Sequence, residues 1–92
     1  MNESLLEDLW IGAFRYYCGR QTIAVHSFAN GLIKAIDKGQ LPERAHMVIK
    51  RDLIELINDD DKDRENGRWY KTLGDDVDRA LWLKVLAALS GM

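Results

Sequence analysis

The chain has one cysteine, one proline and no long apolar run. A single cysteine, Cys18, cannot form an internal disulfide, which suits a protein of the reducing cytosol. No apolar stretch approaches the roughly 20 residues that a membrane-spanning helix needs. The first ten residues, MNESLLEDLW, also lack the basic start and apolar core of a signal peptide. We therefore expect a cytoplasmic protein.

Metal-binding motifs are also missing. His26 and His46 lie twenty residues apart, and no further histidine or cysteine completes a zinc-ligand spacing. The acidic run 59–65 matches a calcium loop only in part. An EF-hand frame that begins at its first residue places Arg64 where glycine is required and Tyr70 where a bidentate glutamate is required. We expect no metal and no cofactor.

Sequence motifs of catalysis are absent as well. The chain has no nucleophile elbow, no phosphate-binding glycine loop and no dinucleotide fingerprint. Cys18 falls at the end of an expected helix, where the negative end of the helix dipole disfavours a thiolate. A chain of 92 residues has a small core, which leaves little room for an enclosed pocket. We therefore expect a binding protein and not an enzyme.

Apolar residues recur at helical spacing along most of the chain. They predict an all-α protein of four helices, a single domain over 1–92, with short connections that favour antiparallel neighbours. Gly19 and Gly39 suit the left-handed position after a helix, and Pro42 suits the first helical turn. The expected helices cover residues 5–18, 22–38, 42–58 and 76–90.

The polar run NDDDKDRENG, residues 58–67, has no apolar anchor and is expected to be an acidic loop between the third and fourth helices. Charge is uneven around it. Residues 12–51 carry seven basic and two acidic side chains, a balance of +5, whereas residues 55–78 carry four and nine, a balance of −5. Such asymmetry can orient a charged partner. The loop residues that we expect to contact this partner are Asp59, Asp60, Asp61 and Asp63.

On a helical wheel the first helix has one apolar half, which we expect to face the core. Ile11 falls on the opposite half, and Trp82 lies on a fourth helix that is apolar nearly all round. Exposed apolar side chains mark interaction sites. Both residues are therefore expected to contact a partner protein or a second copy in a homodimer. The apolar half of the first helix comprises Leu5, Leu6, Leu9, Trp10, Ala13, Phe14, Tyr16 and Tyr17.

Arginine and large aromatic side chains often dominate protein interfaces. Those that we assign to a partner-binding surface are Arg15, Tyr16, Arg20, Trp69 and Tyr70. Arg15 is expected to point outward. Arg20 can cap the carbonyls of the first helix or pair with the acids of residues 75–78, and we expect it to point inward to those acids.

Two motifs point to a family. The first is W-x-x-A-F-R-Y-Y-x-G-R-x-T-I-A, from Trp10 to Ala24, and the second is YKTLGDDVDRALW, from Tyr70 to Trp82. Together they resemble small uncharacterised proteins that bacteriophages and prophages encode. The resemblance implies a phage setting, in which proteins of this size bind host protein complexes. The most specific function that the resemblance implies is inhibition of a bacterial defence system, as anti-CRISPR proteins do.

A second class of function remains open. Two helices joined by a tight turn, at Gly19 or at the segment GQLPER, are typical of a helix–turn–helix regulator. The expected second helix offers Lys34 and Lys38 for phosphate contacts, which is few for a recognition helix. Nucleic acid is thus the alternative partner, and salt-dependent binding to a duplex would distinguish it.

Overall fold

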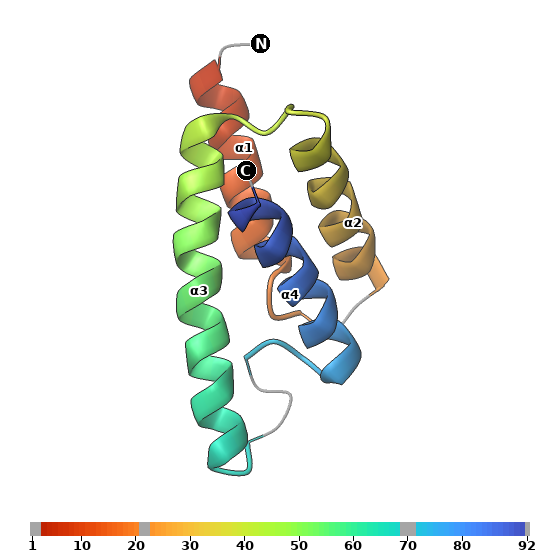
Figure 1. The fold of residues 1–92 in the computed structure, drawn as a ribbon, viewed down its shortest axis with the longest axis vertical. Coiled ribbons are helices and arrows are strands. Elements are labelled where there is room, and N and C mark those ends of the chain that lie inside the picture. Colours follow the sequence, from red (N-terminus) through yellow and green to blue (C-terminus); the bar gives the residue numbers. More distant parts are fainter. Residues whose placement is uncertain (1–2, 21–22, 69–71, 92) are drawn as a thin grey trace.

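Four helices account for most of the described chain (Figure 1). The structure is a computed structural model that describes residues 3–20, 23–68 and 72–91. α1 spans Glu3–Tyr17, α2 spans Ile23–Asp37, α3 spans Glu43–Glu65 and α4 spans Asp76–Ser90. The predicted all-α four-helix architecture is confirmed. Within the described ranges, none of these helices has both the length and the apolar character that crossing a bilayer requires.

The third helix is longer than the sequence pattern predicts. α3 continues to Glu65, so the expected acidic loop over 58–67 is wrong for all but its last two residues. Arg68 donates its backbone N–H to the carbonyl of Asp63 at 2.7 Å, and Gly67, at φ 76°, donates to Arg64 at 3.1 Å. This pair of bonds is the Schellman arrangement, in which Gly67 takes the left-handed position after the C-cap Asn66 and the helix ends at Glu65.

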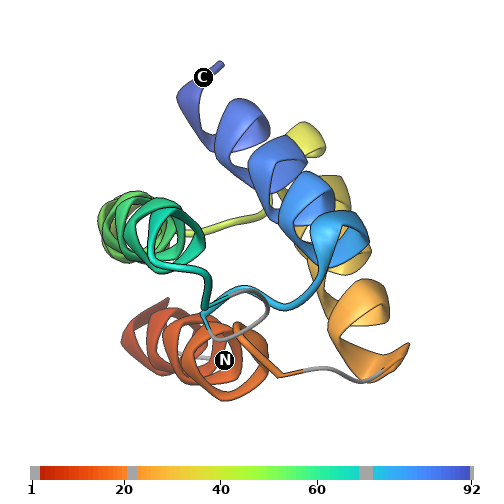
Figure 2. The same ribbon diagram turned by 90° about the horizontal axis from the view of Figure 1, so that it is seen from below.

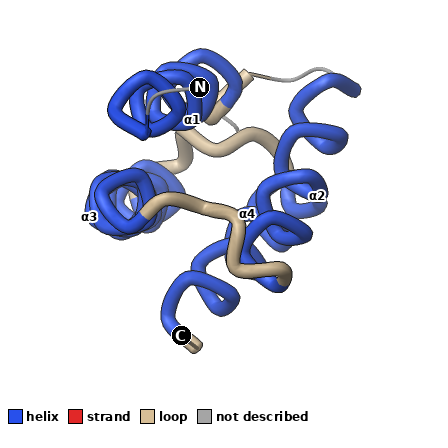
Figure 3. The backbone as a smooth tube through the Cα atoms, turned by 90° about the horizontal axis from the view of Figure 1, so that it is seen from above, coloured by secondary structure: helices blue, strands red, loops and turns tan. Residues whose placement is uncertain are grey.

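The helices alternate in direction along the chain, as the short connections predict (Figure 1). Around the bundle, however, their order is α1, α2, α4, α3 (Figures 2 and 3). α1 packs against α2 and α3, and α4 packs against the same two helices, whereas the described parts of α2 and α3 do not pack directly on each other. The neighbours α1 and α3 therefore run parallel, and so do α2 and α4.

Aromatic side chains fill the centre of the bundle between α1, α2 and α4. Trp82 is fully buried, and its ring meets Phe14 edge to face with 5.7 Å between centroids. Phe28 lies 6.5 Å from Trp82 and stacks on Tyr17 at 5.1 Å. The prediction that Trp82 contacts a partner is wrong, because α4 packs against both α2 and α3 and turns this side chain into the core.

α1 buries a face that is rotated relative to the one its helical wheel predicts, and Phe14 belongs to both faces. Ile11 and Phe14 are 6% and 1% exposed, whereas Leu5 and Leu9 are each 52% exposed and Tyr16 is 56% exposed. The prediction that Ile11 contacts a partner is therefore wrong. Both faces of α1 carry apolar side chains, so its own pattern does not determine which face packs. The positions of α2 and α3 select the face that includes Ile11.

Candidate functional site

The acids of α3 have very different environments, and Asp60 is fully buried. Its Oδ2 atom accepts hydrogen bonds from Nε of Arg64 and from Nε of Arg79, both at 2.7 Å. A buried carboxylate needs such paired charges, because its desolvation is costly. The prediction that Asp60 contacts a partner is therefore wrong, since the two arginines enclose it at the junction of α3 and α4.

The same arginines extend the network to the surface. Nη1 of Arg64 donates to Oδ1 of Asp76 at 2.6 Å, and Nη2 of Arg79 donates to Asp61. Hydrogen bonds to Asp76 and to Asp60 raise the pKa of Arg64 above its ordinary value, so this guanidinium stays charged. Asp61 and Asp76 are both exposed, and solvent screens their pairs. The network ties the lower part of α3 to the first turn of α4.

The motif LGDDVDR builds the beginning of α4. Oδ1 of Asp75 accepts from the backbone N–H of Asp78 at 2.9 Å, and Oδ2 of Asp78 accepts from the N–H of Asp75 at 3.1 Å. This reciprocal pair is a capping box. Oδ1 of Asp78 also lies 2.5 Å from Nε2 of His26 on α2. Gly74, at φ 84°, leaves room for this carboxylate, because a Cβ there would collide with it. The motif is therefore structural at most of its positions.

Arg20 and Arg15 both lie on the surface. Nε of Arg20 donates to the carbonyl of Tyr16 at 2.6 Å, and its guanidinium covers the Tyr16 ring at 4.2 Å from the centroid. Arg20 thus caps the first helix, which was one of its two alternatives. The prediction that it points inward to the acids of residues 75–78 is wrong, because those acids pair with other groups. Arg15 points outward, as predicted, and Nη2 lies 3.2 Å from Oδ2 of Asp52 on α3.

A groove of about 390 Å³ separates the last turns of α1 from α3. Phe14 and Leu56 supply its apolar lining, and α3 supplies three carboxylates. Asp52 pairs with Arg15 and Arg51, whereas Glu55 and Asp59 form no ion pair with another described residue. We call this feature the acidic groove, and its lining residues are Phe14, Arg15, Cys18, Asp52, Glu55, Leu56 and Asp59.

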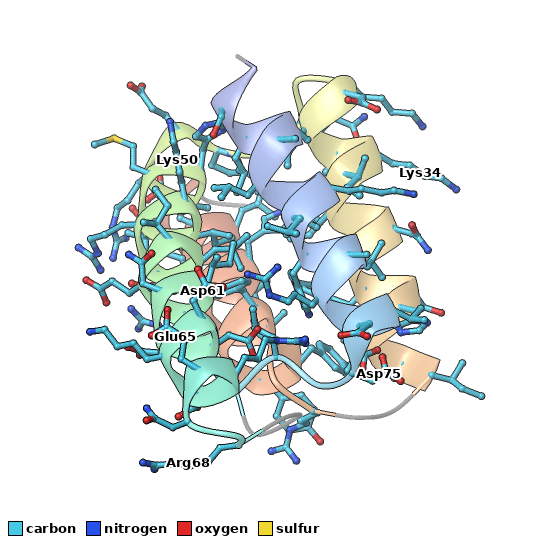
Figure 4. All side chains as sticks on the ribbon, turned by 60° about the horizontal axis from the view of Figure 1, so that its bottom comes forward. Lys34, Lys50, Asp61, Glu65, Arg68 and Asp75 are labelled. Carbon is cyan, nitrogen blue, oxygen red and sulfur yellow. The ribbon has the colours of Figure 1, made fainter. Side chains whose placement is uncertain are left out.

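A row of acids continues from the acidic groove along α3. Glu55, Asp59 and Asp63 follow one another at four-residue spacing, which places them about 6 Å apart along the helix axis. The first two are exposed, and Asp63 accepts from Oγ1 of Thr72 at 2.5 Å. We call these three residues the acidic row. Figure 4 shows that Asp61 and Glu65 lie on this same part of α3.

The C-terminal end of α3 projects past the other helices (Figure 1), and the acidic row runs from the acidic groove toward that end. α3 has 23 residues and α1, α2 and α4 have 15 each, a difference of about 12 Å in length. Glu55 was not among the predicted site residues. Its four-residue spacing to Asp59 is visible in the sequence, but the spacing has meaning only once the helix is known to continue.

Cys18 lies at the edge of the acidic groove and is partly buried. Burial raises the pKa of its thiol from 9.0 to about 12. The thiol is therefore protonated at neutral pH and lacks the thiolate that acts as a nucleophile or metal ligand. In the described part of the chain, no three histidine, cysteine, aspartate or glutamate side chains are arranged to hold a metal ion.

The predicted partner residues thus divide between core and surface. Arg15, Tyr16, Arg20, Asp59 and Asp61 are exposed, and Asp63 is half-buried. Trp69 and Tyr70 lie outside the described residues. Comparisons with family models, with curated proteins and with solved structures found no match to this chain. Function is therefore inferred from the acidic groove and the acidic row.

Proposed function

We propose that the protein is a phage-type accessory protein that acts without catalysis, in the cytoplasm of a bacterial host, by binding a host protein complex. The observation that carries this proposal is the acidic row on a helix that projects beyond the bundle. In its sharpest version the partner is the effector of a defence system, and the acidic row occupies a basic channel that otherwise holds nucleic acid.

The acidic groove is suited to a basic side chain of the partner. Leu56, which is half-buried, can pack against the aliphatic stem of an arginine or lysine, because such side chains bury their stems on apolar surface. Glu55 and Asp59 can accept hydrogen bonds from its charged end. Charge-assisted hydrogen bonds of this kind are the strong ones, and arginine forms them with planar geometry. The groove and row together favour a partner with several exposed basic residues.

The helical state of the acids also supports partner binding. Residues 52–65 carry seven acidic and two basic side chains, a balance of −5. In a loop these acids would have to be ordered on binding, at an entropic cost for each residue. On α3 their spacing is already set, and the Asp60 pairs hold that part of the helix against α4. A preorganised acidic surface binds more tightly for the same contacts.

Phage plating tests the sharpest version. Expression of the protein in bacteria with an active CRISPR system should raise the plating efficiency of a targeted phage. The double variant Glu55→Gln/Asp59→Asn should reduce this effect. Purified effector should bind the variant roughly a hundredfold more weakly, because each charge pair at a desolvated interface contributes about 1.5 kcal/mol or more.

The matched control is Asp37→Asn/Glu43→Gln, which removes the same two charges from exposed positions at the end of α2 and the start of α3. It should retain full activity. Unchanged plating across strains with different defence systems would contradict the inhibitor version. Equal loss in both double variants would show that total charge matters and not the acidic row. Binding to a mixed-sequence duplex that weakens with salt would instead support the helix–turn–helix alternative.

A further inference from the structure

α1 has a second apolar face, and this face points away from the bundle. Leu5, Leu9, Gly12 and Tyr16 follow the spacing four, three, four, which keeps them on one side of a helix. All four are exposed, and they lie opposite the buried pair Ile11 and Phe14. α1 is at the outer edge of the bundle (Figure 3), flanked by α2 and α3. We call these four residues the outer stripe of α1.

The outer stripe is complementary to itself when two copies of α1 pack in opposite directions. The pairs Leu5 with Tyr16 and Leu9 with Gly12 have the same midpoint along the helix. A two-fold axis through that midpoint therefore places Leu5 of one copy against Tyr16 of the other, and Leu9 against Gly12. Apart from its chain neighbours and the adjacent backbone of α1, no described atom lies within 4 Å of the Cβ position at Gly12. This open notch can receive the Leu9 side chain of a second copy.

Charge complementarity selects the antiparallel direction. Asp8 and Arg15 flank the outer stripe on the same side, two turns apart, with side chains 63% and 58% exposed. The two-fold axis keeps that flank on one side of both helices, so Asp8 of each copy lies beside Arg15 of the other. In a parallel two-fold pair this flank would lie on opposite sides of the two helices, so Asp8 and Arg15 would not meet across the contact. Antiparallel packing also aligns the helix dipoles favourably.

Within one chain the same two residues already form ion pairs, Asp8 with the exposed Arg44 and Arg15 with the half-buried Asp52. Asp8 accepts from Nη1 of Arg44 at 3.3 Å, and Arg15 donates to Asp52 at 3.2 Å. Exposed pairs of this kind contribute little stability, so sharing them with a second copy is inexpensive. We propose that the protein forms a two-fold symmetric homodimer through antiparallel packing of the outer stripe of α1. This proposal does not depend on the proposed function.

The oligomeric state in solution tests the dimer. A contact made mainly by one helix face is smaller than a standard interface, so dissociation is expected on the order of 0.01 to 1 mM. Sedimentation equilibrium of the full chain over that range should show the mass rising toward twice the 10.6 kDa of one chain. Leu9→Glu should weaken association at least tenfold, because it places a charge in the apolar contact. A monomer mass at every concentration would overturn the proposal.

Gly12→Gln separates dimerisation from folding. The site is exposed and open, and glutamine is a better helix former than glycine, so the thermal midpoint of the monomer should stay the same or rise. The added side chain fills the notch, so the dimer should be lost. Ile54→Glu, on an exposed site of α3, is the matched control and should leave the dimer intact. A dimer that survives both Leu9→Glu and Gly12→Gln would overturn the assignment to α1.

Cross-linking tests the direction of packing. In a Cys18→Ser background, Leu5→Cys and Tyr16→Cys variants are mixed and treated with a short bifunctional maleimide, which spans the 8–10 Å between packed helices. The antiparallel arrangement predicts cross-links between the two variants in preference to cross-links within either one. Predominant cross-linking of Leu5→Cys chains to one another would show parallel packing and contradict the proposal.

Discussion

The acids of residues 52–65 look alike in the sequence, but single residues among them have opposite roles. Asp59 is exposed at the acidic groove, and Asp60, its neighbour, is fully buried between two arginines. One step along a helix turns the side chain by 100°, which is enough to move it from solvent to the interior. Arg79, on α4, supplies the second of the two positive charges next to Asp60. At the residue scale, the helix position of each acid decides whether it stabilises the fold or stays exposed to solvent.

Asp60→Ala should therefore be strongly destabilising. Removing one partner of a buried ion pair leaves uncompensated charge, at a cost of about 3 kcal/mol or more. Urea unfolding followed by circular dichroism measures the change in the free energy of unfolding. Asp59→Ala is the matched control and should change it by no more than about 0.5 kcal/mol, as exposed substitutions usually do. Equal effects of the two substitutions would contradict the buried network.

Among the secondary-structure elements, α3 is the one whose length differs most from the prediction of the sequence pattern. The predicted bounds of the fourth helix, 76–90, match α4, and the first two helices differ from the prediction by one or two residues. α3 exceeds its prediction by seven residues at its C-terminal end, since it stops at Glu65 instead of residue 58. The last turns lack apolar residues, so periodicity gave no signal there. The remaining signals were the Asp60–Arg64 spacing, which favours a helix, and Gly67 as its end.

Proline at residue 58 distinguishes a continuous helix from a loop. Asn58 is exposed, so its side chain contributes little to packing. Asn58→Pro should nevertheless lower the free energy of unfolding by about 3 kcal/mol, because proline inside a helix removes a backbone hydrogen bond and clashes with the preceding turn. Asn58→Ala should be neutral or slightly stabilising. Equal thermal midpoints for the proline and alanine variants would mean that the helix ends near residue 58.

For the whole molecule, the order α1, α2, α4, α3 around the bundle explains why the apolar pattern predicts a surface position for Ile11 and Trp82, although both are buried. Which face of α1 packs depends on where α2 and α3 lie, and α4 is central because it meets both of them. Neither fact is encoded in the apolar pattern of one helix. The helix count and fold class follow from local pattern, whereas the choice between two apolar faces is made by tertiary packing. The acidic groove depends on the same packing, because α1 and α3 supply its two walls.

Trp82→Ala tests the central position of α4. Trp82 contacts aromatic rings of both α1 and α2, so its removal should lower the free energy of unfolding by about 3–5 kcal/mol. Thermal unfolding measured by circular dichroism should show a much lower midpoint or no folded baseline. Leu83→Ala, at the next and more exposed position of α4, is the control and should have a clearly smaller effect. A small change in the free energy of unfolding for Trp82→Ala would contradict the buried position of this side chain.

The bundle order also has a consequence for folding during synthesis. The parallel pairs α1 with α3 and α2 with α4 join segments that are tens of residues apart in the sequence. Such non-local contacts form more slowly than the local contacts of a helical hairpin, because a long loop must close first. Phe14 in particular meets Trp82, which is synthesised near the end of the chain. The core therefore closes only after nearly the whole polypeptide has left the ribosome, so this fold is acquired after translation and not helix by helix.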